Sequence, residues 1–145
     1  LRQQRQVRRA PADRIEEVQE ARDRGVKELV CWGDGSPTRE FLYVEDAAEG
    51  LITGAELYNG EDPVNLGSGF EVTIKDLTEK ITRLSGFEGS LVWDTARPNG
   101  QPRRLLDTTR AAERFGFRAK VNLEDGLKKT IEWYEKNPVG LAAHT

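Results

Sequence analysis

The stretch "PVNLGSGFEVTIKDLTEKITRLSG", residues 63–86, decides the fold class, because a strand, a glycine turn and a helix follow one another in it. Residues 63–66 are apolar at alternate positions and are predicted to form a strand. The helix predicted over residues 73–86 starts with a capping-box pattern of Thr73 and Asp76 and ends at Gly86. Its predicted buried side contains Ile74, Leu77, Ile81 and Leu84.

The alternation of strands and helices continues on both sides of this stretch. On the N-terminal side we predict a helix over residues 13–24, with Asp13 as cap and Gly25 as stop. A strand at 27–32 and an extended segment at 39–44 follow. The next predicted helix covers residues 45–58 and has Ala48, Leu51, Ile52 and Ala55 on one face. On the C-terminal side we predict a strand at 90–94, a loop at 95–104 and a short helix at 108–116. The last predicted helix covers residues 122–138. It is capped by Asn122, and its inward-facing residues are Leu123, Leu127, Ile131 and Tyr134. The predicted fold class is therefore α/β, in an α+β-like form with short strands and about five helices, since three short strands are too few for a complete Rossmann sheet.

Length and composition favour one globular domain. The chain has 145 residues, of which 32% are charged and 37% apolar, and its net charge of -3 speaks against a general nucleic-acid binder. It has one cysteine, no apolar run long enough for a membrane span and no signal-peptide pattern, so we expect a cytoplasmic protein. We divide it into a basic arm over residues 1–12, a domain over 13–138 and a frayed tail over 139–145.

The glycine turn "GSGFEV", residues 67–72, has the strand-to-helix context of a dinucleotide-binding fingerprint. The third glycine of that fingerprint is replaced by Val72, which would push the helix away from the strand. We therefore interpret the segment as a tight turn, in which Gly67 and Gly69 allow positive φ angles, and predict no cofactor-binding residues.

Several catalytic patterns are missing from the sequence. The only histidine is His144, beside the C-terminus, which excludes nucleophile schemes that need a well-placed histidine. No tyrosine is followed four residues later by lysine, and no Walker loop, CxxC or HExxH motif occurs. We predict no catalytic residue and no metal site.

Two loops have unusual side chains. "WGDGSPTREF", residues 32–41, places Trp32 and Arg39 on either side of a glycine- and proline-rich bend, and "RPNGQPRR", residues 97–104, brings three arginines next to two amides. An indole can stack on a base or sugar, and a guanidinium suits a diphosphate. The residues alone leave two interpretations open: a site for a nucleotide sugar, or a hydrophobic lid with surface arginines.

Four blocks of the sequence resemble one family. "WGDGSPTREFLYVEDAAEG", "VNLGSGFEVTIKDL", "WDTARPNGQPRRLLD" and "LEDGLKKTIEWY" are similar, in the same order, to the GDP-L-fucose synthases, which are NAD-dependent epimerase/dehydratases of the extended short-chain dehydrogenase class. The resemblance covers about residues 15–137 and implies the small substrate-binding domain of such an enzyme.

The resemblance also implies site residues. Trp32, Arg39 and Asn99 correspond to family positions that contact the GDP-sugar, and Arg104 to a phosphate partner. NADP is the cofactor of the parent family, but its glycine fingerprint and the Ser/Tyr/Lys triad do not appear in this chain. Cys31 lies outside the family's catalytic motif and is expected to be a small buried residue.

We therefore expect a truncated GDP-L-fucose synthase-like domain that binds a GDP-sugar but, as an isolated chain, has no enzyme activity. Two alternatives remain at this stage. One is an oligomerising or partner-binding module without ligand binding, in which a homo-oligomer covers an exposed apolar surface. The other is a fragment of a full epimerase/reductase.

Overall fold

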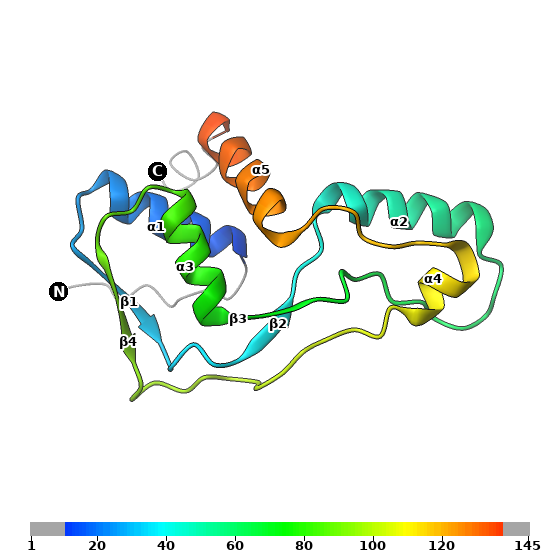
Figure 1. Ribbon diagram of the computed structural model, residues 1–145, viewed down its shortest axis with the longest axis horizontal. Helices are drawn as coiled ribbons and strands as arrows, with labels where there is room; N and C mark the ends of the chain where they lie inside the picture. Colours follow the sequence, from blue (N-terminus) through cyan, green and yellow to red (C-terminus); the bar gives the residue numbers. More distant parts are fainter. Residues whose placement is uncertain (1–10, 138–145) are drawn as a thin grey trace, which may run out of the picture.

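The computed structural model describes residues 11–137, which contain five helices and four short strands (Figure 1). In chain order the elements are α1 (Pro11–Asp23), β1 (Glu28–Trp32), β2 (Thr38–Glu40), α2 (Val44–Leu57), β3 (Glu71–Thr73), α3 (Ile74–Leu84), β4 (Ser90–Asp94), α4 (Thr109–Phe115) and α5 (Leu123–Lys136). The predicted tail over 139–145 and His144 lie outside the described residues, as does most of the predicted arm over 1–12. Among the described helices, none is long and apolar enough to cross a membrane.

The hydrophobic core lies where α1, α3 and α5 pack together beside the strands β1 and β4 (Figure 1). Ile15 and Val18 of α1 and Ile81 of α3 are completely buried there. Leu127 and Ile131 of α5 complete the contact, each only 4% exposed. The core is built from helix faces at the predicted spacing, because those apolar stripes have no other way to leave water.

The predicted caps of the two main core helices are confirmed. The Thr73 side chain accepts a hydrogen bond from the Asp76 amide at the start of α3, at 2.9 Å. The Asn122 side chain does the same for the Asp125 amide at the start of α5, also at 2.9 Å. Each cap satisfies one of the amides that a first helical turn leaves without a partner.

The strands form two separate sheets of two strands each. β1 and β4 are parallel, with Glu28 opposite Ser90 and Trp32 opposite Asp94. β2 and β3 are antiparallel, with Thr38 opposite Thr73. Short strands of both kinds with five helices confirm the predicted α/β, α+β-like fold class for the described part of the chain.

The strand predicted at residues 63–66 is wrong, and a strand that was not predicted, β3, follows it. A strand needs a neighbour for its main-chain groups, and residues 63–66 lie instead beside α2 and the segment before α4. There, the side-chain amide of Asn65 donates to the carbonyl of Asp107 at 3.2 Å, and Leu66 packs near Gly50. β3 forms because its three residues meet β2.

Two predicted boundaries also move. Helix α1 begins at Pro11, so Asp13 lies within its first turn and is not its cap. Proline suits this position because the first amides of a helix have no acceptor. The extended segment predicted over 39–44 ends as a strand at Glu40, and Val44 is already the first residue of α2.

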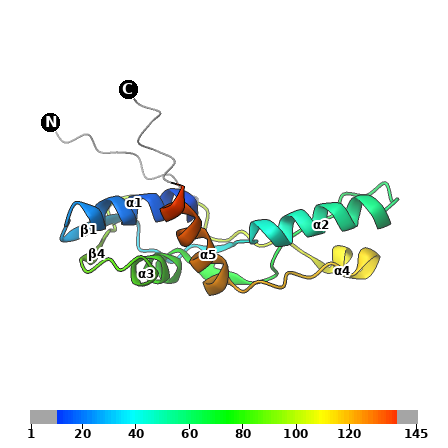
Figure 2. The same ribbon diagram turned by 90° about the horizontal axis from the view of Figure 1, so that it is seen from above.

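Helices α2 and α4 extend away from the core, which makes the molecule elongated (Figures 1 and 2). α2 packs on α4 where Gly54 approaches the ring of Phe115, and on the segment after α4 where Gly50 approaches the ring of Phe117. Its predicted apolar face is therefore turned outward. Leu51 and Ile52 are 65% and 61% exposed, and Ala48 and Ala55 are exposed as well.

Candidate functional site

The two loops singled out in the sequence leave the same end of one sheet. Because β1 and β4 are parallel, their carboxyl ends lie side by side, and the loops that follow them start next to each other. The contact continues beyond the strands, since the Gly33 amide donates to the carbonyl of Asp94 at 2.9 Å. The topology of the small sheet thus brings the loop after Trp32 against the arginine-rich loop, residues 97–104.

Trp32 is half-buried at the start of this contact and is covered by Arg97. The Arg97 guanidinium carbon lies 4.9 Å from the centre of the indole ring, a cation–π distance. Arg97 also pairs with Asp94 at 3.5 Å. A ligand that reached this edge would meet a stacked indole–guanidinium pair, not the bare indole expected from the sequence.

Asn99 holds the two loops together. Its side-chain oxygen accepts a hydrogen bond from the Asp34 amide at 2.8 Å. Gly33 makes this approach possible, since its φ of +79° places the chain where an added Cβ atom would overlap Asn99. Asp34 in turn accepts from the Ser36 amide, and the Ser36 side chain and amide together lower the pKa of the Asp34 carboxyl group. The Asn99 side-chain NH₂ keeps its two donors for other partners.

Arg39 extends from β2 to the arginine-rich loop. Its guanidinium donates to the carbonyl of Thr38 at 2.6 Å and to the carbonyl of Gln101 at 2.7 Å. These bonds use two of the five N–H donors of a guanidinium, so the group fixes the loop and retains donors for an anion. The main chain supports the same contact, because the Thr38 amide donates to Pro102 at 2.9 Å.

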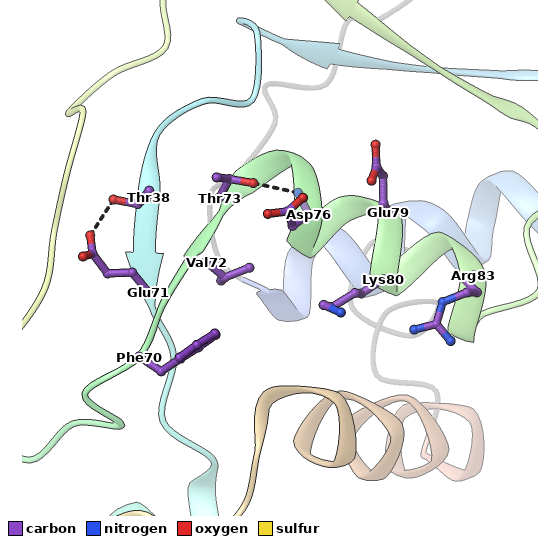
Figure 3. Close-up of a pocket in the computed structure, with 9 residues that line it drawn as sticks. All are labelled: Thr38, Phe70, Glu71, Val72, Thr73, Asp76, Glu79, Lys80 and Arg83. Carbon is purple, nitrogen blue, oxygen red and sulfur yellow. Dashed lines mark hydrogen bonds between the residues drawn. The ribbon is translucent and has the colours of Figure 1, made fainter.

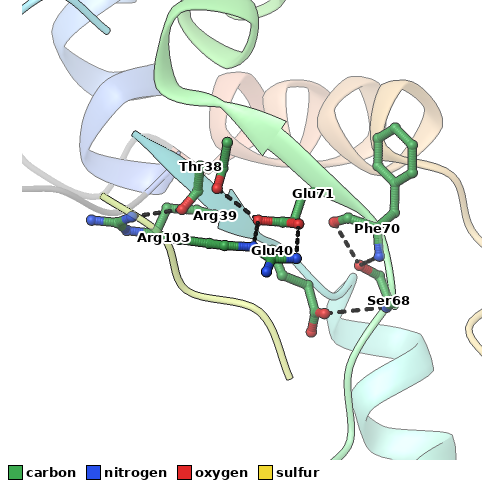
Figure 4. A network of polar contacts seen from close by, with 8 residues as sticks. Thr38, Arg39, Glu40, Ser68, Phe70, Glu71 and Arg103 are labelled. Carbon is green, nitrogen blue, oxygen red and sulfur yellow. Dashed lines mark hydrogen bonds and ion pairs between the residues drawn. The ribbon is translucent and has the colours of Figure 1, made fainter. Parts of the chain in front are cut away.

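Arg103 and Arg104 have different surroundings although they are neighbours. Arg103 donates twice to the Glu71 carboxylate, at 2.9 and 2.7 Å, and Thr38 donates to the same carboxylate at 2.6 Å (Figure 4). These bonds lower the pKa of Glu71 to about 2. Arg103 and Arg104 both line an open cavity of about 730 Å³, together with Gly69, Gln101 and the residues that lead into α4. Of these two arginines, only Arg103 makes an ion pair within the described residues, and its partner is Glu71.

The glycine turn beside this cavity is engaged by a carboxylate. The Gly69 amide donates to Glu40 at 3.2 Å, and Gly69 has the predicted positive φ, +70°. The prediction of positive φ for Gly67 is wrong; an added Cβ atom at Gly67 would displace the Glu40 carboxylate. A carboxylate at this turn would repel a phosphate, so the turn does not fit a dinucleotide diphosphate.

Cys31 is completely buried at the start of this region, as expected. Burial raises the pKa of its thiol, and Arg14 donates to the sulfur at 3.6 Å. A buried thiol with a raised pKa is a poor nucleophile. The residue therefore packs the sheet against α1 and takes no part in the candidate site.

Sequence reasoning missed three side chains of this region: Glu40, Glu71 and Arg97. Glu40 and Glu71 meet their partners only through the pairing of β2 with β3, and short polar strands carry no clear pattern for such pairing. Arg97 is part of the arginine-rich loop. The sequence does not reveal that the turn after β4 places this arginine over Trp32.

Comparisons with known proteins identify relatives of this chain. Residues 2–67 match the NAD dependent epimerase/dehydratase family. The sequence is 48% identical over 120 residues to "Putative GDP-L-fucose synthase 2" of Arabidopsis thaliana, covering 83% of this chain and 36% of that protein. It is 36% identical over 127 residues to "GDP-L-fucose synthase" of Escherichia coli, covering 81% of this chain and 39% of that protein.

Solved structures of similar proteins match this chain in fold. A GDP-L-fucose synthetase from Naegleria fowleri bound to NADP matches with a TM-score of 0.82 at 26% identity, over 90% of this chain and 41% of that one. A UDP-glucose 4-epimerase from Thermotoga maritima with UDP-glucose matches with a TM-score of 0.71 at 29% identity, over 84% of this chain and 39% of that one. The chain spans somewhat more than a third of the length of the curated relatives it matches.

Proposed function

We propose that this chain, which is similar to part of the GDP-L-fucose synthases and matches the NAD dependent epimerase/dehydratase family over residues 2–67, binds a GDP-sugar. The observation that carries the proposal is the contact between two loops, which runs from Trp32 with Arg97 through Arg39 with Gln101. The two loops in this contact contain an indole, several arginines and two side-chain amides. A sugar nucleotide needs such a combination of groups, since it consists of a base, a diphosphate and a hydroxylated ring.

The four residues predicted from the sequence take distinct roles in this proposal. Arg104 contacts the diphosphate, because it lines the open cavity and has no ion-pair partner among the described residues. Arg39 contributes the N–H groups that its bonds to the Thr38 and Gln101 carbonyls do not use. Trp32, stacked with Arg97, borders the position of the base or sugar, and the Asn99 amide donates to a ligand hydroxyl or carbonyl.

We propose that these residues bind and orient the sugar nucleotide and do not themselves carry out proton or hydride transfer. Arginine, asparagine and tryptophan are poor general bases near neutral pH. The sequence has no tyrosine followed four residues later by lysine, and its one histidine is His144. NADP is bound in the Naegleria relative, and we assign none of the four residues to it.

Calorimetric titration of the protein with GDP-fucose and with GDP tests the proposal. We expect heat of binding at millimolar ligand or below, and affinity about tenfold lower or more in Arg39→Ala and Arg104→Ala, the loss expected for one charge-assisted hydrogen bond. Arg118→Ala is the matched control, because this exposed arginine lies outside both loops and makes no described ion pair. Absence of heat at millimolar ligand, or equal loss in all three variants, would overturn the proposal.

The exposed face of α2 favours a second candidate function, self-association. Val44, Ala48, Leu51, Ile52 and Ala55 follow helical spacing and are all exposed, although isolated chains rarely leave such a stripe in water. We propose that a second copy of the chain covers it. Light scattering tests this: we expect a dimer that Leu51→Glu converts to a monomer, and a monomer at high concentration would contradict it.

A further inference from the structure

The carboxylate of Glu71 joins three segments of the chain. It belongs to β3 and accepts a hydrogen bond from the Thr38 hydroxyl of β2 at 2.6 Å. Arg103 of the arginine-rich loop donates to it twice, at 2.9 and 2.7 Å. The Glu71 side chain is only 23% exposed, so these partners shield it from most of the solvent. The four residues assigned to the ligand do not include it.

The Glu71 side chain reaches the loop because successive residues of a strand point to opposite faces. Val72, the next residue, is buried in the hydrophobic core, so Glu71 points away from the core and lies beside Thr38 (Figure 3). Thr38 is two positions along β2 from Glu40, the residue opposite Glu71, and the side chains of Thr38 and Glu71 therefore share one face of the small sheet. The burial of Val72 thus fixes the direction of the carboxylate.

The main chain joins the arginine-rich loop to β2 through Thr38. The Thr38 amide donates to the carbonyl of Pro102 at 2.9 Å, and the Thr38 carbonyl accepts from the Arg104 amide at 3.2 Å. Two bonds to one residue set the distance of the loop from β2, but they let the loop tilt about that residue. The parallel bonds from Arg103 to Glu71 attach the loop to a second strand and oppose this tilt.

Arg104 is the proposed ligand residue that depends most on this attachment. It directly follows Arg103, and both residues line the open cavity. Arg39, the other arginine assigned to the ligand, is fixed separately by its bond to the Gln101 carbonyl. A long side chain holds a ligand in a defined place only if the main chain beneath it is fixed. The main chain of Arg104 is fixed on one side by Thr38 and on the other through Arg103.

We propose that Glu71 is a positioning residue of the GDP-sugar site, which holds Arg103 and thereby the main chain from which Arg104 reaches the ligand. The inference rests on the proposed function and adds to it a residue that does not itself touch the ligand. The negative charge of Glu71 works against an anion. Any support that Glu71 gives to phosphate binding therefore comes from geometry and not from its charge.

The test compares dissociation constants for GDP, measured by titration in nuclear magnetic resonance spectra of the ¹⁵N-labelled protein. Glu71→Gln removes the charge that holds Arg103, and Arg103→Lys keeps the positive charge but cannot make two parallel bonds. We expect the affinity of both variants to be about threefold lower, the size expected for one exposed ion pair. Charge alone predicts the opposite for Glu71→Gln, because this variant loses a negative charge beside an arginine of the cavity. Glu113→Gln, at an exposed site on α4, is the control and should bind GDP unchanged.

A double-mutant cycle separates positioning from a general loss of stability. In Arg104→Ala the contact that Glu71 supports is gone, so adding Glu71→Gln should lower the affinity for GDP no further. Circular dichroism checks that each variant is folded. Unchanged or higher affinity in Glu71→Gln or Arg103→Lys, or a further loss of the same size in the double variant, would overturn this inference and leave the proposed GDP-sugar site intact. Absence of GDP binding by the unchanged protein would overturn both.

Discussion

Arg103 and Glu71, 32 residues apart in the chain, meet through two hydrogen bonds of 2.9 and 2.7 Å. The pair fastens the arginine-rich loop to β3, beside the open cavity that Arg103 and Arg104 both line. Two parallel bonds between a guanidinium and a carboxylate fix orientation as well as distance. The pair therefore fixes the orientation of the loop relative to β3.

The pH dependence of stability should report this pair. The pKa of Glu71 is about 2 in the folded protein, against an ordinary value of 4.5. A carboxyl group with a lowered pKa stabilises the fold above its ordinary pKa, and this contribution is lost as the pH falls from about 5 toward 2. In Glu71→Gln, urea unfolding should therefore depend less on pH in this window than in the unchanged protein.

The effect on stability should be small, because the pair is exposed to solvent and screened by salt. Glu113→Gln is the control, since Glu113 has no described ion-pair partner. Identical pH profiles for the Glu71→Gln protein and the unchanged protein would show that the Glu71–Arg103 pair does not persist in solution.

Gly33→Ala should destabilise the protein more than Gly25→Ala. Both residues have positive φ, +79° and +62°, which costs an alanine about 1–2 kcal/mol. At Gly25 an added Cβ atom meets nothing within 4 Å, whereas at Gly33 it overlaps Asn99. Urea unfolding measures the loss of unfolding free energy in each variant. The extra loss in Gly33→Ala reports the contact between the two loops, and equal losses in the two variants would contradict this prediction.

Asn122→Ala should lower the unfolding free energy by about 1 kcal/mol, because the Asp125 amide loses its side-chain acceptor at the start of α5. Asn122→Ser keeps an oxygen acceptor at the cap without adding a charge beside Asp125, and should lose less. Thermal unfolding followed by circular dichroism compares the three proteins. If alanine and serine are equally destabilising, the cap is not the cause.

Ile81→Ala should cost about 2–5 kcal/mol, since this side chain is completely buried between the core helices and leaves a cavity. Leu51→Ala removes as many carbon atoms from a side chain that is 65% exposed, and should change the unfolding free energy of the monomer by less than about 0.5 kcal/mol. Urea unfolding at low protein concentration makes the comparison. A large loss in Leu51→Ala would mean that the α2 face is covered within one chain.

The parts of the fold that the sequence predicted are those set by local signals. Helices α3 and α5 were predicted with their caps, because Thr73 and Asn122 act on amides three residues away. The strand at residues 63–66 was predicted wrongly, since its apolar alternation does not reveal whether a neighbouring strand exists. β3 was missed because three residues with a glutamate among them give no periodic signal.

The candidate site was predictable in its components but not in its contacts. Trp32, Arg39 and the arginine-rich loop stand out by residue type and by their resemblance to a family. Their apposition depends on the parallel pairing of β1 with β4, which joins residues far apart in the chain. For the same reason, the bond from Arg39 to the Gln101 carbonyl could not be read from the sequence.

The pairing of Glu28 with Ser90 has a kinetic consequence. Between them lie β2, α2, β3 and α3, so the chain must close a long loop before β1 gains its neighbour. We therefore expect the two loops to assemble late in refolding, after the helices. Any partial opening that separates β1 from β4 should release both loops together, so that their amides share one rate of exchange with deuterium.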